Sequence, residues 1–366
     1  MPRPKKKPEA GAQGASFYEI AEQALALERR GKDIVRLNVG DTNLPVPQRA
    51  KDAAAKSMRD GRGGYGSSRG SEELLSLIAA REKCGIENVV VGPGSKHLLF
   101  ALLSVLCKKG DSVAFPSPHW PAYSLACAQL GLRTKTKDTL LGNAWQFETL
   151  PKAKLAIICN PLNPASTIHG HESVSRAISD AGKAGSRLII DEAYRGIAFE
   201  PIPAYDCIRL RSFSKEFNME NWRLGYAVAP EETAEKLVKF NQITSTCVPQ
   251  FVQQAGIACL ENEKGLLSEN TAIWKSRMGA AGRALKKAGF VFAQPQSGMY
   301  LFAAHERVED GGRFALSLLG KGVAVAPGSG FGNYGRFIRI CANQPEGLLE
   351  RAIEKMGEAA HAVPRT

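Results

Sequence analysis

The chain has 366 residues, of which 44% are hydrophobic and 23% charged, so it is long enough to bury a substantial core. This composition excludes a wholly disordered, collagen-like or coiled-coil chain, and at roughly 100–200 residues per domain it predicts two domains or one large one. Lysine and arginine total 48 against 36 aspartate and glutamate, and the net charge of +12 suits anionic ligands without choosing between a phosphate and a nucleic acid.

Residues 1–15 are basic, rich in proline and glycine, and show no apolar periodicity. We expect a disordered, solvated tail there rather than an arm that binds nucleic acid or an anionic surface. No apolar segment follows the basic start, so we expect no signal peptide. The longest apolar run, residues 98–107, is too short to cross a bilayer.

Strands and helices are predicted to alternate along the first two thirds of the chain. Helices are expected over residues 17–30, 48–59, 95–107, 123–130 and 171–184, with one more beginning at 71. Short strands are expected over residues 34–39, 89–91, 112–115, 155–159, 188–190, 208–211 and 225–229. This alternation predicts an α/β fold with a mostly parallel central sheet flanked by helices.

The pattern changes past about residue 255. A long helical stretch over residues 272–288 precedes strand-like segments at 298–303, 322–326 and 336–341, and a final helix follows them. We therefore predict a large domain over residues 46–255 and a smaller α+β domain built from residues 16–45 together with 256–366.

The eight cysteines form no CxxC pair, and most lie in apolar segments as small core residues. Free thiols of this kind predict a reducing compartment, and we expect a cytoplasmic protein. His169 and His171 form an HxH pair with no third ligand at a recognisable spacing, so we expect a surface turn there and no metal site.

Polar side chains follow several of the predicted buried strands. Asp191 comes directly after one strand, Asn163 closes the strand before it, and Lys215 closes a later strand with Arg223 eight residues beyond. Ser95 opens a helix just after another strand. In an open parallel sheet the carboxyl ends of the strands line the ligand crevice. An aspartate after a strand can also simply cap a helix. The prediction of a ligand site therefore depends on the aspartate, asparagine, lysine, arginine and serine occurring together.

This combination fits pyridoxal phosphate. A lysine amine condenses with an aldehyde when burial or a neighbouring charge lowers its pKa. A buried aspartate keeps a pyridine nitrogen protonated, which makes the ring an electron sink. A helix N-terminus, hydroxyl groups and an arginine fork are the groups that bind a phosphate.

Several sequence blocks resemble the signatures of class I/II aminotransferases, the fold-type I pyridoxal-phosphate enzymes related to aspartate aminotransferase. They are Asn38-Val-Gly40-Asp, Tyr65-Gly-Ser-Ser-Arg-Gly70, Asn160-Pro-Leu-Asn163-Pro, Asp191-Glu-Ala-Tyr194, Ser212-Phe-Ser-Lys215, Trp222-Arg223-Leu-Gly-Tyr, Gly322-Val-Ala-Val-Ala-Pro-Gly328 and Phe337-Ile-Arg339-Ile. The likeness covers nearly the whole chain beyond the basic tail. It implies a large domain with a mostly parallel sheet, a smaller α+β domain and pyridoxal 5'-phosphate as the cofactor.

The resemblance also implies a role for each matching residue at the cofactor ring. Lys215 would form the aldimine and shuttle the proton, and Asp191 would pair with the pyridine nitrogen. Tyr194 and Asn163 would contact the ring oxygen, and Trp120 would stack on the ring.

The remaining implied roles concern the phosphate, the substrate and the partner subunit. The phosphate would be held by Gly94, Ser95, the backbone of Lys96, Ser212 and Arg223. Arg339 would clamp the substrate α-carboxylate with Gly40 and Asn163. Tyr65 would reach the phosphate in the other subunit of a homodimer.

The implied function is transamination, in which an α-amino group moves from an amino-acid donor to a 2-oxo acid acceptor. A C–S lyase, decarboxylase or cyclase of the same scaffold would keep the same residues, so these alternatives stay open. A cofactor-binding regulator is less favoured, because about fifteen residues before the first helix are too few for a helix-turn-helix unit. We expect no membrane partner and no nucleic-acid partner.

Three features of the sequence carry no prediction about specificity. The motifs do not indicate the donor or the acceptor. Ala165-Ser166 stands where the family usually has Thr-Gly, and the connection over residues 140–154 is shorter than usual. Either departure could change the shape of the site.

Overall fold

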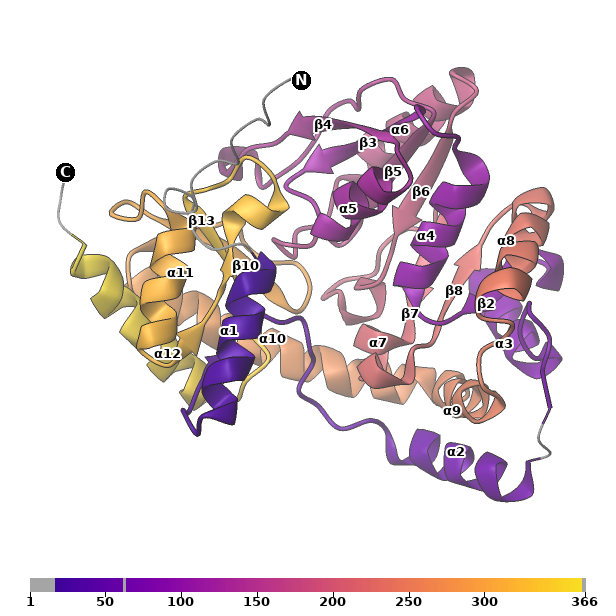
Figure 1. Cartoon of the computed structure of the whole chain (residues 1–366), viewed down its shortest axis with the longest axis horizontal. Coiled ribbons are helices and arrows are strands. Elements are labelled where there is room, and N and C mark those ends of the chain that lie inside the picture. The colour runs from indigo at the N-terminus through magenta and orange to yellow at the C-terminus, as the bar shows by residue number, and fades with distance from the viewer. Residues whose placement is uncertain (1–16, 62–63, 364–366) are drawn as a thin grey trace, which may run out of the picture.

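The computed structural model describes residues 17–61 and 64–363. The predicted basic tail over residues 1–15 lies outside the described residues. Figure 1 shows a larger body around one sheet and a smaller body that contains both described ends of the chain. Among the described helices, none is long and apolar enough to cross a membrane.

The larger body is built on a seven-stranded sheet of the described residues, in the order β2-β8-β7-β6-β5-β3-β4. Its strands are β2 (Val89–Gly92), β3 (Ser112–Ser117), β4 (Arg133–Asp138), β5 (Leu155–Cys159), β6 (Arg187–Asp191), β7 (Ile208–Ser212) and β8 (Gly225–Val228). Only β8 runs antiparallel to its neighbours, β2 and β7. The mostly parallel sheet that the sequence predicts is therefore confirmed.

Helices bury both faces of this sheet (Figure 1). They are α3 (Glu72–Glu82), α4 (Ser95–Leu106), α5 (Pro121–Gln129), α6 (His171–Lys183), α8 (Glu231–Thr244) and α9 (Gln250–Leu260), and α2 (Gln48–Asp60) packs on α9. Successive strand side chains point to opposite faces. Ile157 thus packs in a core with Leu98 of α4, whereas Ile158 packs with Val174 of α6. Buried aliphatic side chains on both faces explain why these strands appear in the sequence as continuous apolar runs.

The smaller body combines the two ends of the chain. It contains α1 (Phe17–Arg29), β1 (Val35–Arg36), β9 (Phe290–Phe292), β10 (Tyr300–His305), α11 (Gly311–Gly320), β11 (Val323–Ala324), β12 (Ala326–Pro327), β13 (Phe337–Cys341) and α12 (Glu346–His361). Four of the strands form a sheet in the order β12-β13-β10-β9, and β1 pairs with β11. Ile20 and Ala24 of α1 share a core with residues of α11 and α12.

The long helix α10 (Glu263–Lys287) runs from the larger body to the smaller one (Figure 1). Trp274 packs in the core of the central sheet, and Met278, one turn later, packs in the core of the smaller body. One rigid helix therefore contributes to both cores. The domain boundary at residues 255/256 stays a prediction.

The structure contains elements that the sequence analysis did not predict. The edge strand β4 consists of Arg133-Thr-Lys-Thr-Lys-Asp138, and all six residues are exposed, so it has no apolar alternation to reveal it. Lysines on an edge strand disfavour pairing with another chain. Helices α8, α9 and α11 were also missed, and the strand expected over residues 34–39 is only the two-residue β1.

Candidate active site

A cavity of about 250 Å³ lies at the carboxyl ends of β5, β6 and β7, where residues of β10 and β13 face the central sheet. Most of the predicted site residues line it, namely Gly40, Ser95, Lys96, Trp120, Asn163, Asp191, Tyr194, Ser212, Lys215, Arg223 and Arg339. Strands that are parallel end at one edge of a sheet, which is why residues distant in sequence meet there.

Lys215 lies in α7 (Phe213–Glu216), a single helical turn that begins where β7 ends. Ser212 caps this turn, because its Oγ accepts a 3.2 Å hydrogen bond from the backbone N–H of Ser214. Lys215 Nζ donates to the carbonyl of Gly40 and lies 3.6 Å from the carboxylate of Glu220. Burial lowers the pKa of Lys215 below that of an ordinary lysine, although Glu220 opposes this shift. Its amine therefore loses a proton more readily than a solvated lysine does.

Asp191 is the last residue of β6, and its side chain is buried. Its carboxylate accepts a 2.7 Å hydrogen bond from the Tyr123 hydroxyl and a 3.1 Å bond from the Ala193 backbone N–H. Burial raises the pKa of Asp191, and these two hydrogen bonds oppose the shift. Among the described residues, no basic side chain forms an ion pair with Asp191. A buried carboxylate in this state is suited to bind a cationic N–H group from a ligand.

Asn163 connects the two bodies at the cavity. Its Nδ2 donates a 3.0 Å hydrogen bond to the Tyr194 hydroxyl, and its Oδ1 accepts a 3.1 Å bond from Arg339 Nη1. Arg339 Nη2 donates to the carbonyl of Asn38 at 2.7 Å, and the guanidinium lies 4.2 Å from the centre of the Tyr300 ring. Arg339 is therefore fixed in a buried position beside the cavity, with its orientation set by both bodies.

The N-terminus of α4 and Arg223 form a cationic end of the cavity. Gly94 precedes Ser95 with φ of +82°, and a Cβ added there would lie 2.6 Å from Arg223 Nη2. A Cβ added to Gly225 would lie 2.7 Å from the backbone nitrogen of Ser95. Glycine is thus required at both positions for the guanidinium and the helix N-terminus to approach each other. Backbone N–H groups, hydroxyls and an arginine together suit a phosphate group.

The side chain of Lys96 also borders the cavity, where the sequence analysis gave a role only to its backbone. Its Nζ lies 5.2 Å from the centre of the Trp120 ring. Burial and the nearby Arg223 lower the pKa of Lys96. The cavity therefore has a second lysine amine, at Lys96, in addition to the one at Lys215.

Some residues of the cavity were missed from the sequence, and one predicted residue lies elsewhere. Tyr300 and Ser214 line the cavity, and Tyr123 donates a hydrogen bond to Asp191 from behind it, but the sequence motifs assign no site role to any of the three. The sequence signal for Tyr123 is its position three residues after Trp120, the residue that precedes α5. Tyr65 does not line the cavity, and 91% of its surface is exposed.

Comparisons with known proteins agree with this architecture. Residues 32–356 match the family model for aminotransferase class I and II. An aspartate aminotransferase of Thermococcus kodakarensis is 35% identical over 312 residues, which cover 83% of each chain. An LL-diaminopimelate aminotransferase of Dehalococcoides mccartyi is 26% identical, over 93% of this chain and 95% of its own. The solved aspartate aminotransferase of Thermotoga maritima matches at a TM-score of 0.87 and 26% identity, over 94% of this chain and 96% of its own.

Proposed function

The chain belongs to the aminotransferase class I and II family, and from that membership we propose that the cavity around Lys215 is its active site. The protein is a pyridoxal-phosphate-dependent transaminase, whose substrates are amino acids and 2-oxo acids. We place the active site in this cavity because Lys215, Asp191 and Arg339 all line it.

The groups around the cavity fit each part of pyridoxal phosphate. The raised pKa of Asp191 and its lack of a described ion-pair partner suit a pyridinium N–H. Asn163 and Tyr194 supply hydrogen-bonding groups for the ring oxygen, and Trp120 supplies an aromatic face. When bound, the cofactor acts as an electron sink that makes the Cα–H bond of an amino acid acidic.

The phosphate would be held at the cationic end of the cavity. Gly94 and Ser95 begin α4 there, the backbone of Lys96 follows in the first turn, and Ser212 and Arg223 border the same space. The positive end of the helix dipole adds to the charge of the arginine. This placement leaves the side chain of Lys96 available for another ligand group.

Lys215 is suited to hold and move a proton. Its lowered pKa makes the neutral amine easier to reach than in a solvated lysine, and the neutral form can accept a proton at Nζ from a substrate α-carbon. The carbonyl of Gly40 and the carboxylate of Glu220 lie beside this nitrogen and orient it. Burial keeps bulk water from competing for the proton.

Arg339 is suited to hold the substrate α-carboxylate. Its guanidinium is planar, buried and fixed by Asn38 and Asn163, and the ring of Tyr300 covers one of its faces. A carboxylate held by such a fork is retained during the reaction. This favours amino-group transfer over decarboxylation on the same scaffold.

We infer that the donor has a second carboxylate in its side chain. The support is the side chain of Lys96, which places a further cationic group at the cavity beyond the one assigned to the α-carboxylate. Relatives named aspartate aminotransferase point to the same class of donor. Aspartate is therefore the donor that we propose.

We propose a homodimer in which Tyr65 reaches the phosphate of the partner's site. The support is the exposure of Tyr65 and its absence from the cavity of its own chain. Closed two-fold dimers are the commonest assemblies of enzymes. Sedimentation should give a dimer mass, and mixing inactive Lys215→Ala and Tyr65→Phe subunits should restore activity. A fully active monomer would contradict the proposal.

The eight free cysteines support the cytoplasm as the location.

A half-reaction tests the proposed activity. Enzyme loaded with pyridoxal phosphate and mixed with aspartate, but no acceptor, should release one equivalent of 2-oxo acid per site and then stop. Adding a 2-oxo acid acceptor should restart turnover. Continuous consumption of an amino acid without acceptor, with release of carbon dioxide or of ammonia and a thiol, would show a lyase instead.

A further inference from the structure

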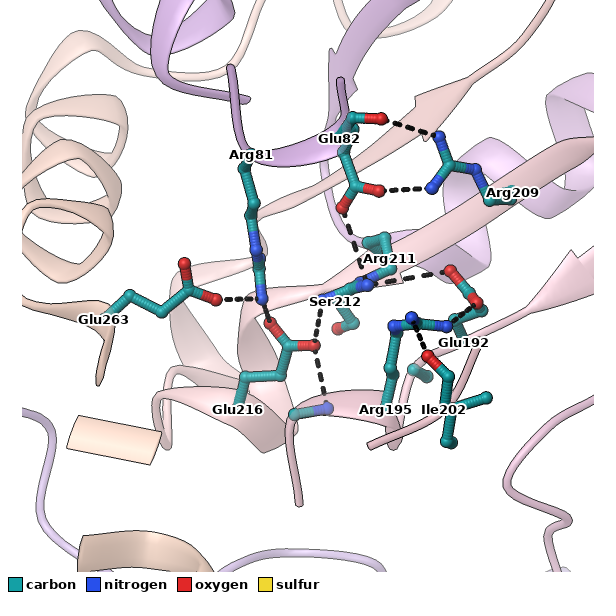
Figure 2. A network of polar contacts seen from close by, with 12 residues as sticks. Arg81, Glu82, Glu192, Arg195, Ile202, Arg209, Arg211, Ser212, Glu216 and Glu263 are labelled. Carbon is teal, nitrogen blue, oxygen red and sulfur yellow. Dashed lines mark hydrogen bonds and ion pairs between the residues drawn. The ribbon is translucent and has the colours of Figure 1, made fainter. Parts of the chain in front are cut away.

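A network of buried ion pairs lies beside the candidate active site and joins the segments that carry Asp191 and Lys215 (Figure 2). Glu192 directly follows Asp191, and Glu216 directly follows Lys215. These two glutamates are 0% and 1% exposed, so each places a carboxylate in the interior. The proposed reaction uses neither of them.

The carboxylate of Glu216 is held from three sides. Arg81 Nη2 and Arg211 Nη2 each donate to it at 2.8 Å (Figure 2). The backbone N–H of Gly196 donates to it at 3.1 Å. Gly196 lies in η3 (Arg195–Ile197), immediately after Tyr194. A Cβ added to Gly196 would lie 2.5 Å from Glu216 Cγ, so the two segments pack closely.

Arg211 extends the connection to the residue after Asp191. Its Nη1 lies 3.6 Å from the carboxylate of Glu192 and 3.5 Å from that of Glu82. One guanidinium therefore contacts the neighbour of Asp191 and the neighbour of Lys215. Arg211 itself precedes Ser212, which caps α7.

The helical turn that carries Lys215 depends on contacts of this kind. It has only four residues, and a helix this short does not hold its position through its own hydrogen bonds. Buried ion pairs add little net stability, because desolvation offsets the attraction. Hydrogen-bonded ion pairs are directional, so they can fix the position of Lys215 better than apolar contacts would.

We propose that Glu216 is a positioning residue, which through Arg211 and Gly196 fixes Lys215 relative to Asp191 and Tyr194. The proposal rests on Lys215 acting as described above. A shift of about 1 Å at a reacting group can lower a rate about a hundredfold. Loosening α7 should therefore lower kcat more than it raises KM, because the substrate clamp at Arg339 stays in place.

The experiment compares Glu216→Gln with the matched control Glu82→Gln in the holoenzyme. The side chain of Glu82 is only 4% exposed and also pairs with Arg211, but it lies on α3, and its ion pairs are with Arg209 and Arg211 of β7 rather than with α7 or η3. Glu216→Gln should lower kcat at least about tenfold, change KM less than about threefold and alter the visible absorbance of the bound cofactor. Glu82→Gln should lower the melting temperature but keep kcat within about threefold of the parent.

A second variant separates positioning from folding. Arg81→Met combined with Glu216→Met removes both members of one buried pair, while Arg211 loses Glu216 and keeps its contacts with Glu82 and Glu192. We expect this double variant to melt below the parent but above Glu216→Met alone, while its kcat stays as low as that of Glu216→Met. The inference would be overturned if kcat of the double variant rose together with its melting temperature. Equal losses of kcat in Glu216→Gln and Glu82→Gln would also overturn it.

The Lys215→Ala variant separates this inference from the proposed function. If Lys215→Ala keeps parental activity, the proposed active site is wrong. If Lys215→Ala is inactive and the two glutamine variants behave alike, only the role of Glu216 is wrong.

Discussion

The hydroxyl of Tyr123 donates a 2.7 Å hydrogen bond to Oδ2 of Asp191 in the interior of the protein. Burial raises the pKa of Tyr123 well above its usual value, so the phenol stays protonated and the carboxylate is the acceptor. This hydrogen bond opposes the effect of burial on Asp191, which by itself favours the neutral acid. Tyr123 therefore helps to keep a negative charge where a pyridinium nitrogen would bind.

Replacing Tyr123 with phenylalanine should weaken cofactor binding. Loss of a hydrogen bond to a charged group costs about 1.5–3 kcal/mol, which is roughly tenfold or more in affinity. Absorbance titration of the apoenzyme with pyridoxal phosphate measures the change. The matched control is Tyr226→Phe, because the Tyr226 hydroxyl donates to buried Glu82 away from the cavity. Equal affinities in the two variants would exclude a role for Tyr123 at the cofactor.

The raised pKa of Asp191 predicts how the stability of the apoenzyme depends on pH. The folded-state pKa lies above the ordinary value of 3.8, so the native state binds more protons than the unfolded state in that window. Stability should therefore fall as pH rises from 3.8 through the folded-state pKa. Asp191→Asn lacks this loss, so its apoenzyme should melt higher than the parent at pH 7 and similarly near pH 3.8. A difference in melting temperature that does not change with pH would contradict the assignment.

The sequence predicted the part of the site that follows directly from strand ends. Lys215, Asp191 and Asn163 come after buried strands, and parallel strands share one edge. It did not predict the partners that come from helix faces. Tyr123 has the apolar spacing of a core residue, and only the fold shows that its hydroxyl meets Asp191. The polar strand β4 was missed for a related reason, because an exposed edge strand has no apolar pattern.

Gly94→Ala should weaken cofactor binding at the phosphate. The new Cβ would lie 2.6 Å from Arg223 Nη2, and the guanidinium would have to move. With φ of +82° and ψ of 160°, Gly94 has a backbone conformation that only glycine readily adopts, so alanine there adds about 1–3 kcal/mol of strain. Gly110→Ala is the matched control, because Gly110 has φ of +90° with nothing within 4 Å of an added Cβ. Both variants should lose stability in a melting experiment, and only Gly94→Ala should bind pyridoxal phosphate more weakly.

Lys96→Met should change the choice of donor. Methionine keeps the length of the side chain and its contact with Trp120 but removes the charge. Loss of a charge-assisted hydrogen bond costs about 1.5–3 kcal/mol, so kcat/KM for aspartate should fall by roughly tenfold or more. The value for alanine, which lacks a second carboxylate, should change little. Equal losses for both donors would show that Lys96 serves the cofactor rather than the substrate.

The most direct measurement of the central claim identifies the lysine that bonds to the cofactor. Lys96 and Lys215 both line the cavity, and only Lys215 follows β7 beside Gly40 and Glu220. Reduction of the holoenzyme with borohydride, followed by peptide mass spectrometry, fixes the cofactor to the amine that it contacts. We expect the label on Lys215 alone, and we expect Lys215→Ala to lose turnover while it keeps its fold. A label on Lys96, or full turnover by Lys215→Ala, would contradict the account.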